Sequence, residues 1–256
     1  MLIDTHCHLD DEKLSNTDEI VKSYLRDGVE AVINAGCSAK SSLEGKKLSE
    51  KYPSVYFASG CHPSDSSTFN QEEFDVIRSL TSHEKCVAVG EIGLDFYWKP
   101  FDKKAQIDCF IKQIELASQV KLPICIHMRD ATLETLKILK ENKEKLTFSG
   151  VMHCYSGSVE TAKEILNLGL YISFAGPLTF KNANGLIEVA KFVPNDMCLT
   201  ETDSPYLAPH PFRGSINQPK NVTVTSAFLA SVKGYEFSEF SKILTKNAKR
   251  LFYKMK

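Results

Sequence analysis

Two histidines separated by one residue, His6 and His8, stand near the start of the sequence and follow Asp4. Side chains two residues apart on a strand point the same way, so both imidazoles would project together while Cys7 packs on the opposite side. Imidazole is a frequent ligand of zinc and other transition metals. A single His-x-His pair is a weak indication of a metal site, so its meaning depends on what other segments bring beside it.

Further residues of metal-binding type follow short apolar runs elsewhere in the chain. Glu91, His127, His153 and Asp203 each lie at or just after the carboxyl end of a predicted strand. The carboxyl ends of barrel strands meet on one face, where barrel active sites are built. Six side chains exceed the three or four that hold a single catalytic zinc, so we expect two divalent metal ions. The candidate ligands are His6, His8, Glu91, His127, His153 and Asp203.

The elements that would position these side chains are short strands alternating with helices. Helical spacing of apolar residues predicts helices over residues 103–120 and 159–168, and a helical tail from Thr223 onward. Eight strands in such an order predict an α/β fold, a single (β/α)8 TIM-barrel domain over residues 1–256. A doubly wound open sheet is the competing architecture, but it offers no reason for the count of eight. The predicted strands are residues 2–5, 31–35, 55–59, 87–90, 124–127, 151–153, 171–174 and 198–200.

The composition narrows the classes of protein to which the chain can belong. The sequence has 256 residues and a formal net charge of -1, which argues against tight non-specific binding to duplex DNA or to anionic membranes. Polar residues interrupt the start of the chain and no apolar run reaches about 18 residues, so neither a leader nor a transmembrane helix is expected. The eight cysteines include no C-x-x-C pair, so we expect reduced thiols and a cytoplasmic location.

Several other polar residues would face the same end of the barrel. His62 follows a predicted strand and is either a functional group or a turn residue. Arg129 would either contact a phosphate oxygen bidentately or form an ion pair with Glu201 or Asp95. Arg213 lies in the loop after the last strand, where it would bind phosphate or remain a solvated surface residue.

Three more residues are candidates for contact with the substrate. Glu201 shares a strand face with Asp203, so it lies in or near the site, although its role is open. Tyr97 and Trp98 follow the strand that ends near Glu91, and they would either stack on unpaired bases or cap the core of the barrel.

Taken together, these segments resemble the TatD family of metal-dependent deoxyribonucleases, which belongs to a superfamily of (β/α)8 metal-dependent hydrolases. The sequence departs from the usual family pattern at Ser215, where a basic residue is common, and at Tyr155, where phenylalanine is commoner. Neither position is a candidate ligand. The matching motifs run in family order: residues 4–9 (DTHCHL), 60–63 (GCHP), 90–95 (GEIGLD), 127–131 (HMRDA), 153–157 (HCYSG), 201–207 (ETDSPYL) and 211–214 (PFRG).

The resemblance implies a division of the ligands between two ions. One metal would be held by His6, His8, Glu91 and Asp203, and the second by Glu91, His127 and His153, with Glu91 bridging them. His62 would lie near the substrate phosphate. Magnesium or manganese is expected for activity, although zinc or another transition metal also suits imidazole ligands.

The function expected from the resemblance is exonuclease-like hydrolysis of DNA, on single strands or strand ends, by a water that bridges two metals. Asp203 would orient that water and take its proton, and His62 would act as an imidazolium. One alternative is another ester or amide hydrolase on the same barrel, such as a D-aminoacyl-tRNA deacylase. Another is a non-catalytic metal-binding module. Glu91 takes the place of the carboxylated lysine of many amidohydrolases, which favours the nuclease, and no membrane or obligate protein partner is expected.

Overall fold

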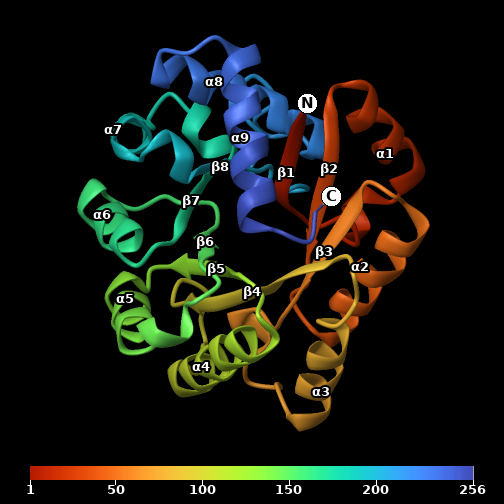
Figure 1. The fold of residues 1–256 in the computed structure, drawn as a ribbon, viewed down its shortest axis with the longest axis vertical. Helices are drawn as coiled ribbons and strands as arrows, with labels where there is room; N and C mark the ends of the chain where they lie inside the picture. The colour runs from red at the N-terminus through yellow and green to blue at the C-terminus, as the bar shows by residue number, and fades with distance from the viewer. Residues whose placement is uncertain (256) are drawn as a thin grey trace.

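Each predicted apolar run forms a strand, and the strands pair side by side in chain order. Within residues 1–255, which this computed structural model describes, one sheet holds eight parallel strands in the order β1 to β8. A bridge between Cys7 and Ser204 joins its two edges. Figure 1 shows the strands around a central axis with helices outside them, which confirms the (β/α)8 barrel. Residue 256 of the predicted domain lies outside the described residues, and the single-domain assignment stays a prediction.

Three strands have the predicted bounds, four extend beyond them, and β6 is shifted one residue toward the amino terminus, so that His153 follows it. β4 was expected to stop at Gly90, but it continues to Asp95 because its pairing with β5 resumes after a register shift between Val89 and Ile92. The strands are β1 Leu2–Cys7, β2 Val29–Ala35, β3 Val55–Ser59, β4 Cys86–Asp95, β5 Ile124–Arg129, β6 Gly150–Met152, β7 Tyr171–Phe174 and β8 Cys198–Thr200.

The helices lie between the strands and cover the outside of the barrel (Figure 1). The expected helical tail is divided into α8 and α9 at Gly234, which adopts a left-handed φ of 74° that glycine tolerates. The helices are α1 Thr17–Arg26, α2 Ala39–Lys51, α3 Gln71–Leu80, α4 Lys103–Val120, α5 Thr132–Glu141, α6 Val159–Asn167, α7 Asn184–Phe192, α8 Val222–Lys233 and α9 Phe237–Leu251. Short 3-10 helices are η1 Glu12–Leu14, η2 Pro63–Asp65, η3 Lys143–Lys145, η4 Gly176–Thr179, η5 Asn195–Met197 and η6 Pro219–Asn221.

The inside of the barrel is packed with apolar side chains at the amino ends of the strands. Ile3, Ile33 and Leu199 belong to this cluster, and Leu251 and Phe252 at the end of α9 pack against it. Figure 1 shows α9 in front of the strands, on the side where both termini lie. A second apolar layer fills the space between strands and helices. Polar residues of the interior are therefore left to the carboxyl ends of the strands.

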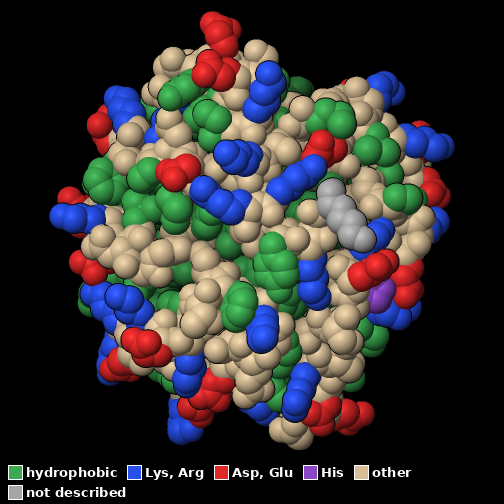
Figure 2. All heavy atoms as spheres, viewed as in Figure 1, with side chains coloured by type: hydrophobic (Ala, Val, Ile, Leu, Met, Phe, Trp, Pro, Cys, Tyr) green, Lys and Arg blue, Asp and Glu red, His purple; other side chains and the backbone are tan. Residues whose placement is uncertain are grey.

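The face around α9 is rich in basic side chains. Figure 2 shows Lys and Arg gathered over this helix, which contributes Lys242, Lys246 and Lys249. No helix within residues 1–255 is long and apolar enough to cross a membrane. All eight cysteines are free, as the sequence predicts.

Candidate metal centre

The candidate ligands lie on segments that end at the same face of the barrel. Three of them stand on strands and three follow strands directly. They are His6 on β1, His8 just beyond it, Glu91 on β4, His127 on β5, His153 after β6 and Asp203 after β8.

The segment after β8 is tied to the end of β1 by its backbone and by a buried carboxylate. The amide of Asp203 donates to the carbonyl of His6 over 2.9 Å. Asp4, which is fully buried, accepts hydrogen bonds from the amide and the hydroxyl of Thr202 at 2.8 and 2.5 Å. These bonds hold Asp203 beside His6, and they give a role to Asp4 that the sequence did not indicate.

Glu91 reaches the centre because β4 and β5 approach each other closely around it. A Cβ atom on Gly93 would lie 2.0 Å from the carbonyl oxygen of His127, and Gly93 has a φ of 145° that side chains rarely allow. A Cβ on Gly90 would lie 2.5 Å from Cβ of Cys125. Glycine in a strand often marks such a close approach or a bulge, and here Gly90 lies beside Glu91 within the register shift and Gly93 lies just after it.

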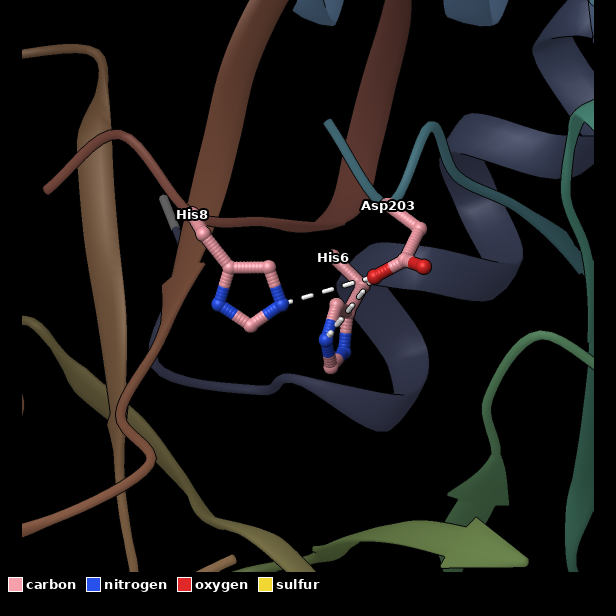
Figure 3. Close-up of side chains that lie close together, drawn as sticks. All are labelled: His6, His8 and Asp203. Atoms are coloured by element: carbon pink, nitrogen blue, oxygen red, sulfur yellow. Dashed lines mark ion pairs between the residues drawn. The ribbon is translucent and has the colours of Figure 1, made fainter. Parts of the chain in front are cut away.

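The first group of ligands surrounds one oxygen of Asp203 and one of Glu91. Nε2 of His8 lies 3.4 Å and Nε2 of His6 lies 3.8 Å from Oδ1 of Asp203, and Figure 3 shows both imidazoles directed at this carboxylate. The same two nitrogens lie 3.2 Å (His6) and 3.8 Å (His8) from Oε2 of Glu91. Four side chains therefore present lone pairs to one small volume.

The second group surrounds the other oxygen of Glu91. Oε1 lies 2.7 Å from Nδ1 of His127 and 2.9 Å from Nε2 of His153, and these two nitrogens are 3.2 Å apart. The two oxygens of Glu91 thus face different groups of histidines. This arrangement suits a carboxylate shared between two cations, one at each oxygen.

The residues present fit the divalent metals expected from the sequence. Nε2 of His6 is buried and has no hydrogen-bond partner among residues 1–255, although buried polar atoms are normally paired. Imidazole nitrogens and carboxylate oxygens converge in both groups, which is the donor set of catalytic transition-metal sites.

The electrostatics of the cluster favour cations. Burial opposes ionisation of Glu91, but His153 and His6 hold the pKa of its carboxyl well below the usual range. Burial likewise opposes protonation of His153, but Glu91 and Glu201 raise the pKa of that imidazole well above its usual value. The pKa of His8 is raised in the same way, against burial, by Cys37 and Asp203. Positive charge is therefore stabilised at both groups.

Two further carboxylates stand behind the histidines of the second group. Oδ2 of Asp95 lies 3.0 Å from Nε2 of His127, and Oε1 of Glu201 lies 3.3 Å from Nδ1 of His153. Such outer carboxylates fix the tautomer and orientation of a metal-binding imidazole. From the sequence alone, Glu201 is expected near the site without a defined role, and Asp95 is expected only as an ion-pair partner of Arg129.

His62 lies beside the second group, with Nε2 3.6 Å from Oε1 of Glu91. Its Nδ1 accepts a hydrogen bond from the amide of Ser64 over 3.1 Å, so the proton of the neutral ring is on Nε2, facing the centre. Burial lowers the pKa of His62 to about 4. The expected imidazolium is therefore a neutral imidazole at pH 7, one that can donate a hydrogen bond but carries no charge.

Two buried glutamines of α4 hold the backbone next to His62 and next to His127. Gln113 accepts from the amide of Cys61 at 2.7 Å and donates to its carbonyl at 3.0 Å. Gln106 makes the same pair of bonds with Asp95, at 2.9 and 2.8 Å. The signal in the sequence was two polar residues, seven apart, on the apolar face of an amphipathic helix.

The other predicted substrate-binding residues are divided between the mouth of the site and the surface. The guanidinium of Arg129 lies 3.8 Å from the ring centre of Tyr97 and 5.3 Å from that of Trp98, and it makes no ion pair with Glu201 or Asp95. The rings of Tyr97 and Trp98 meet edge to face, with centres 4.9 Å apart and planes at 87°, so the three side chains form one cluster. Arg213 is exposed and lies over Phe180, at 4.3 Å from the ring centre, outside the lining of the cavity described next.

The centre lies at the bottom of an open cavity of about 590 Å³. Glu91, His127 and Asp203 line its floor, whereas Trp98, Arg129 and Tyr206 belong to its mouth. Acidic side chains at the floor can hold cations, and the arginine at the mouth can hold an anion. The arrangement suits an anionic substrate drawn onto bound metal ions.

Comparisons with known proteins agree with this geometry. The family model described as "TatD related DNase" matches residues 3–253. An uncharacterized metal-dependent hydrolase of Bacillus subtilis, YabD, is 42% identical over 253 residues, covering 98% of this chain and 99% of its own. An uncharacterized metal-dependent hydrolase of Escherichia coli K12, YcfH, is 40% identical over 261 residues, covering 98% and 96%.

Solved structures extend the similarity to the fold. The crystal structure of YJJV, a TatD homologue from Escherichia coli, superposes with a TM-score of 0.93 at 29% identity and covers 98% of each chain. A phosphotriesterase homology protein from Escherichia coli, solved with phosphate in its active site, has a TM-score of 0.66 at 14% identity, which shows a shared fold alone.

Proposed function

The chain belongs to the family of TatD-related DNases and is a metal-dependent hydrolase, and from that premise we propose that it hydrolyses phosphodiester bonds of DNA, on single strands or strand ends. The observation that carries the proposal is the placement of Glu91, whose two oxygens face separate groups of histidines. The mouth above it adds a cation, Arg129, whose guanidinium lies over the exposed ring of Tyr97 and near that of Trp98. A guanidinium recognises phosphate bidentately, and aromatic rings stack on unpaired bases.

The ligand groups would divide between two divalent ions, with magnesium or manganese proposed for activity. His6, His8, Glu91 and Asp203 would hold the first ion, and Glu91, His127 and His153 the second. When bound, such ions polarise a phosphoryl oxygen and lower the pKa of a water molecule.

Side chains of the cavity accept the proton of the attacking water and bind the phosphate. Burial opposes ionisation of Asp203, but His8 and His153 lower the pKa of this carboxyl, so it is ionised and can accept the proton of the attacking water. His62 donates a hydrogen bond from Nε2 to a phosphate oxygen. Arg129 holds a neighbouring phosphate while Tyr97 and Trp98 keep its guanidinium in place.

The proposal is tested with metal-stripped protein given Mg²⁺, Mn²⁺ or Zn²⁺ and then single-stranded DNA, duplex DNA or a D-aminoacyl-tRNA. We expect cleavage of DNA, faster on single strands, that is lost in Glu91→Ala and His153→Ala. His83→Ala is the matched control, because His83 lies outside the cavity beside Glu50.

Two results would overturn the proposal. One is DNA that stays intact with every metal, and the other is cleavage that survives both substitutions. Deacylation of the tRNA without cleavage of DNA would show instead that the centre hydrolyses carboxylic esters. The cytoplasmic location and the lack of an obligate protein partner stay predictions.

A further inference from the structure

An exposed aromatic ring, that of Tyr206, lies across the cavity from the cluster of Arg129, Tyr97 and Trp98. Tyr206 follows β8, whereas Tyr97 and Trp98 follow β4, which is four places away in the order of strands around the barrel. Tyr206 is 43% exposed, and the centre of its ring lies 6.3 Å from that of His8, a candidate ligand of the first group. Tyr206 also lines the cavity. The sequence did not single out this residue.

The ring of Tyr206 is held in place although it faces solvent. Its hydroxyl donates to Oδ2 of Asp11 over 2.6 Å. Its amide donates to the carbonyl of Asp203 over 2.9 Å, and its carbonyl accepts from the side chain of Asn217 over 2.7 Å. A rigid, exposed aromatic face beside a phosphate-cleaving centre is the kind of platform on which an unpaired base stacks.

A cation stands over the same ring. Nζ of Lys13 lies 4.6 Å from the centre of the Tyr206 ring, and the amide of Lys13 donates to Oδ1 of Asp11 over 2.8 Å. Asp11 therefore orders both the ring and the backbone of Lys13. Within the described chain Lys13 makes no ion pair with a carboxylate, so its charge is available to an anion.

Beyond Lys13 the surface is hollowed into a groove of about 450 Å³ along α1. Lys13, Lys22 and Arg26 line it with one acid, Glu19, and Ile216 adds an exposed apolar surface. Lys22 is paired with Glu19 at 2.8 Å, and Arg26 with Asp27 at 3.5 Å. Among the described cations of the groove, Lys13 is therefore the one that no carboxylate pairs, and it connects the groove to the ring of Tyr206.

We infer that a single-stranded polynucleotide crosses the mouth of the barrel and leaves it over Tyr206 and Lys13 into the groove along α1. A base stacks on Tyr206, Lys13 binds the adjoining phosphate, and the next nucleotides lie in the groove. The inference rests on the proposed function and adds to it a substrate several nucleotides long on one side of the scissile bond. Arg129, Tyr97 and Trp98 hold the strand on the other side.

The test compares a long and a minimal substrate in Tyr206→Ala, Lys13→Ala and the double variant. The substrates are a 20-nucleotide oligodeoxythymidine and bis(p-nitrophenyl) phosphate, which cannot reach the groove. We expect kcat/KM for the oligonucleotide to fall about 5- to 100-fold more than kcat/KM for the small ester, mainly through KM. Lys13→Ala should also make the salt dependence of binding shallower, by about 0.7 in the slope of log K against log salt.

Two controls separate this role from a structural one. Lys246→Ala removes an exposed lysine of α9, on the opposite face of the barrel, and should change neither substrate. Tyr206→Phe keeps the ring and loses only the bond to Asp11, so it should retain most of the preference for the long substrate. Equal losses on both substrates in Tyr206→Ala and Lys13→Ala, or no loss on the oligonucleotide, would overturn the inference.

A binding measurement keeps the inference independent of turnover. Fluorescence anisotropy of a labelled oligodeoxythymidine with metal-free protein reports the path even if no phosphodiester is cleaved. Weaker binding in Lys13→Ala and Tyr206→Ala supports the path, and unchanged binding contradicts it. Failure of all cleavage by the parent protein would instead count against the proposed function.

Discussion

Glu201 stands directly behind His153: Oε1 of the carboxylate lies 3.3 Å from Nδ1 of the imidazole, and Nε2 of the same ring lies 2.9 Å from Glu91. The carboxylate also accepts the amide of Cys154 over 2.6 Å, so it is fixed in position. A proton on Nδ1 is thereby favoured, which leaves the lone pair of Nε2 for a metal ion. We therefore predict that Glu201 positions His153 to bind a metal ion.

Replacing this carboxylate should weaken the second metal site. In Glu201→Gln the amide oxygen can still accept from Cys154, but the charge behind His153 is lost, so we expect metal affinity to fall about 10- to 100-fold. Calorimetric titration of metal-stripped protein measures the change. Glu188→Gln, an exposed acid paired with Lys191, is the matched control. Unchanged metal affinity in both variants would show that Glu201 does not contribute to metal binding.

Asp95 should act on His127 through the tautomer of the ring. Its Oδ1 accepts the amides of Tyr97 and Trp98 at 2.9 and 3.3 Å, while Oδ2 faces Nε2 of His127 at 3.0 Å. In Asp95→Asn the oxygen stays with the amides and an NH₂ group faces His127, which moves the ring proton to Nδ1 and blocks the ligand atom. We expect a loss of one metal equivalent, or at least a tenfold lower affinity, with the fold intact. Metal content after dialysis checks this, and a full two equivalents would contradict it.

Gln113 should contribute both to the stability of the fold and to the position of His62. Gln113→Leu leaves the buried amide and carbonyl of Cys61 without partners, at a cost of about 1–3 kcal/mol for each group. We expect the free energy of unfolding in urea to fall by about 2–4 kcal/mol, and KM to rise because the His62 loop shifts. Gln119→Leu, an exposed glutamine of the same helix, is the control and should change neither quantity by much. Equal stability of the two variants would show that the hydrogen bonds to Cys61 contribute little to the free energy of unfolding.

The eight strands could be predicted because each depends on a local pattern, and the same patterns indicated the candidate ligands, whose role in metal binding stays a prediction. Short apolar runs predicted all the strands, and each candidate ligand followed from its position at a strand end. The extension of β4 to Asp95 could not be predicted, since Gly90 and Gly93 look like breakers in sequence. They are tolerated because the neighbouring backbone of β5 leaves no space for a side chain.

Interactions between distant segments were the part that the sequence did not reveal. The pairings of Glu201 with His153 and of Asp95 with His127 depend on which side chains face each other after the barrel closes. The neutral state of His62 also depends on burial, which its place before a proline does not indicate. The stack of Arg129 on Tyr97 likewise required the structure.

Removal of metal should lower thermal stability if both ligand groups are occupied in solution. A ligand present at 100 times its Kd stabilises a folded protein by about 2.7 kcal/mol, and for a chain of this size each kcal/mol shifts Tm by about 2–4 °C. We therefore expect a chelator to lower Tm by about 5–10 °C in a thermal melt. A His6→Ala, His8→Ala double variant lacks two ligands of the first group and should respond less. A chelator response of the same size in this variant would mean that the stabilising metal binds elsewhere.

Gly93 should be the least replaceable glycine next to the centre. In Gly93→Ala the new Cβ meets the carbonyl of His127 at 2.0 Å, and the φ of 145° is itself strained for alanine, so strand β4 must move away from β5. Destabilisation should exceed about 3 kcal/mol, since backbone strain and a clash with main-chain atoms add together. Gly185→Ala in α7 is the matched control, because a Cβ there meets no atom within 4 Å and alanine favours a helix. Urea unfolding of both variants measures the difference in the free energy of unfolding. If Gly93→Ala is as stable as Gly185→Ala, the close approach of β4 and β5 is not what holds Glu91 in place.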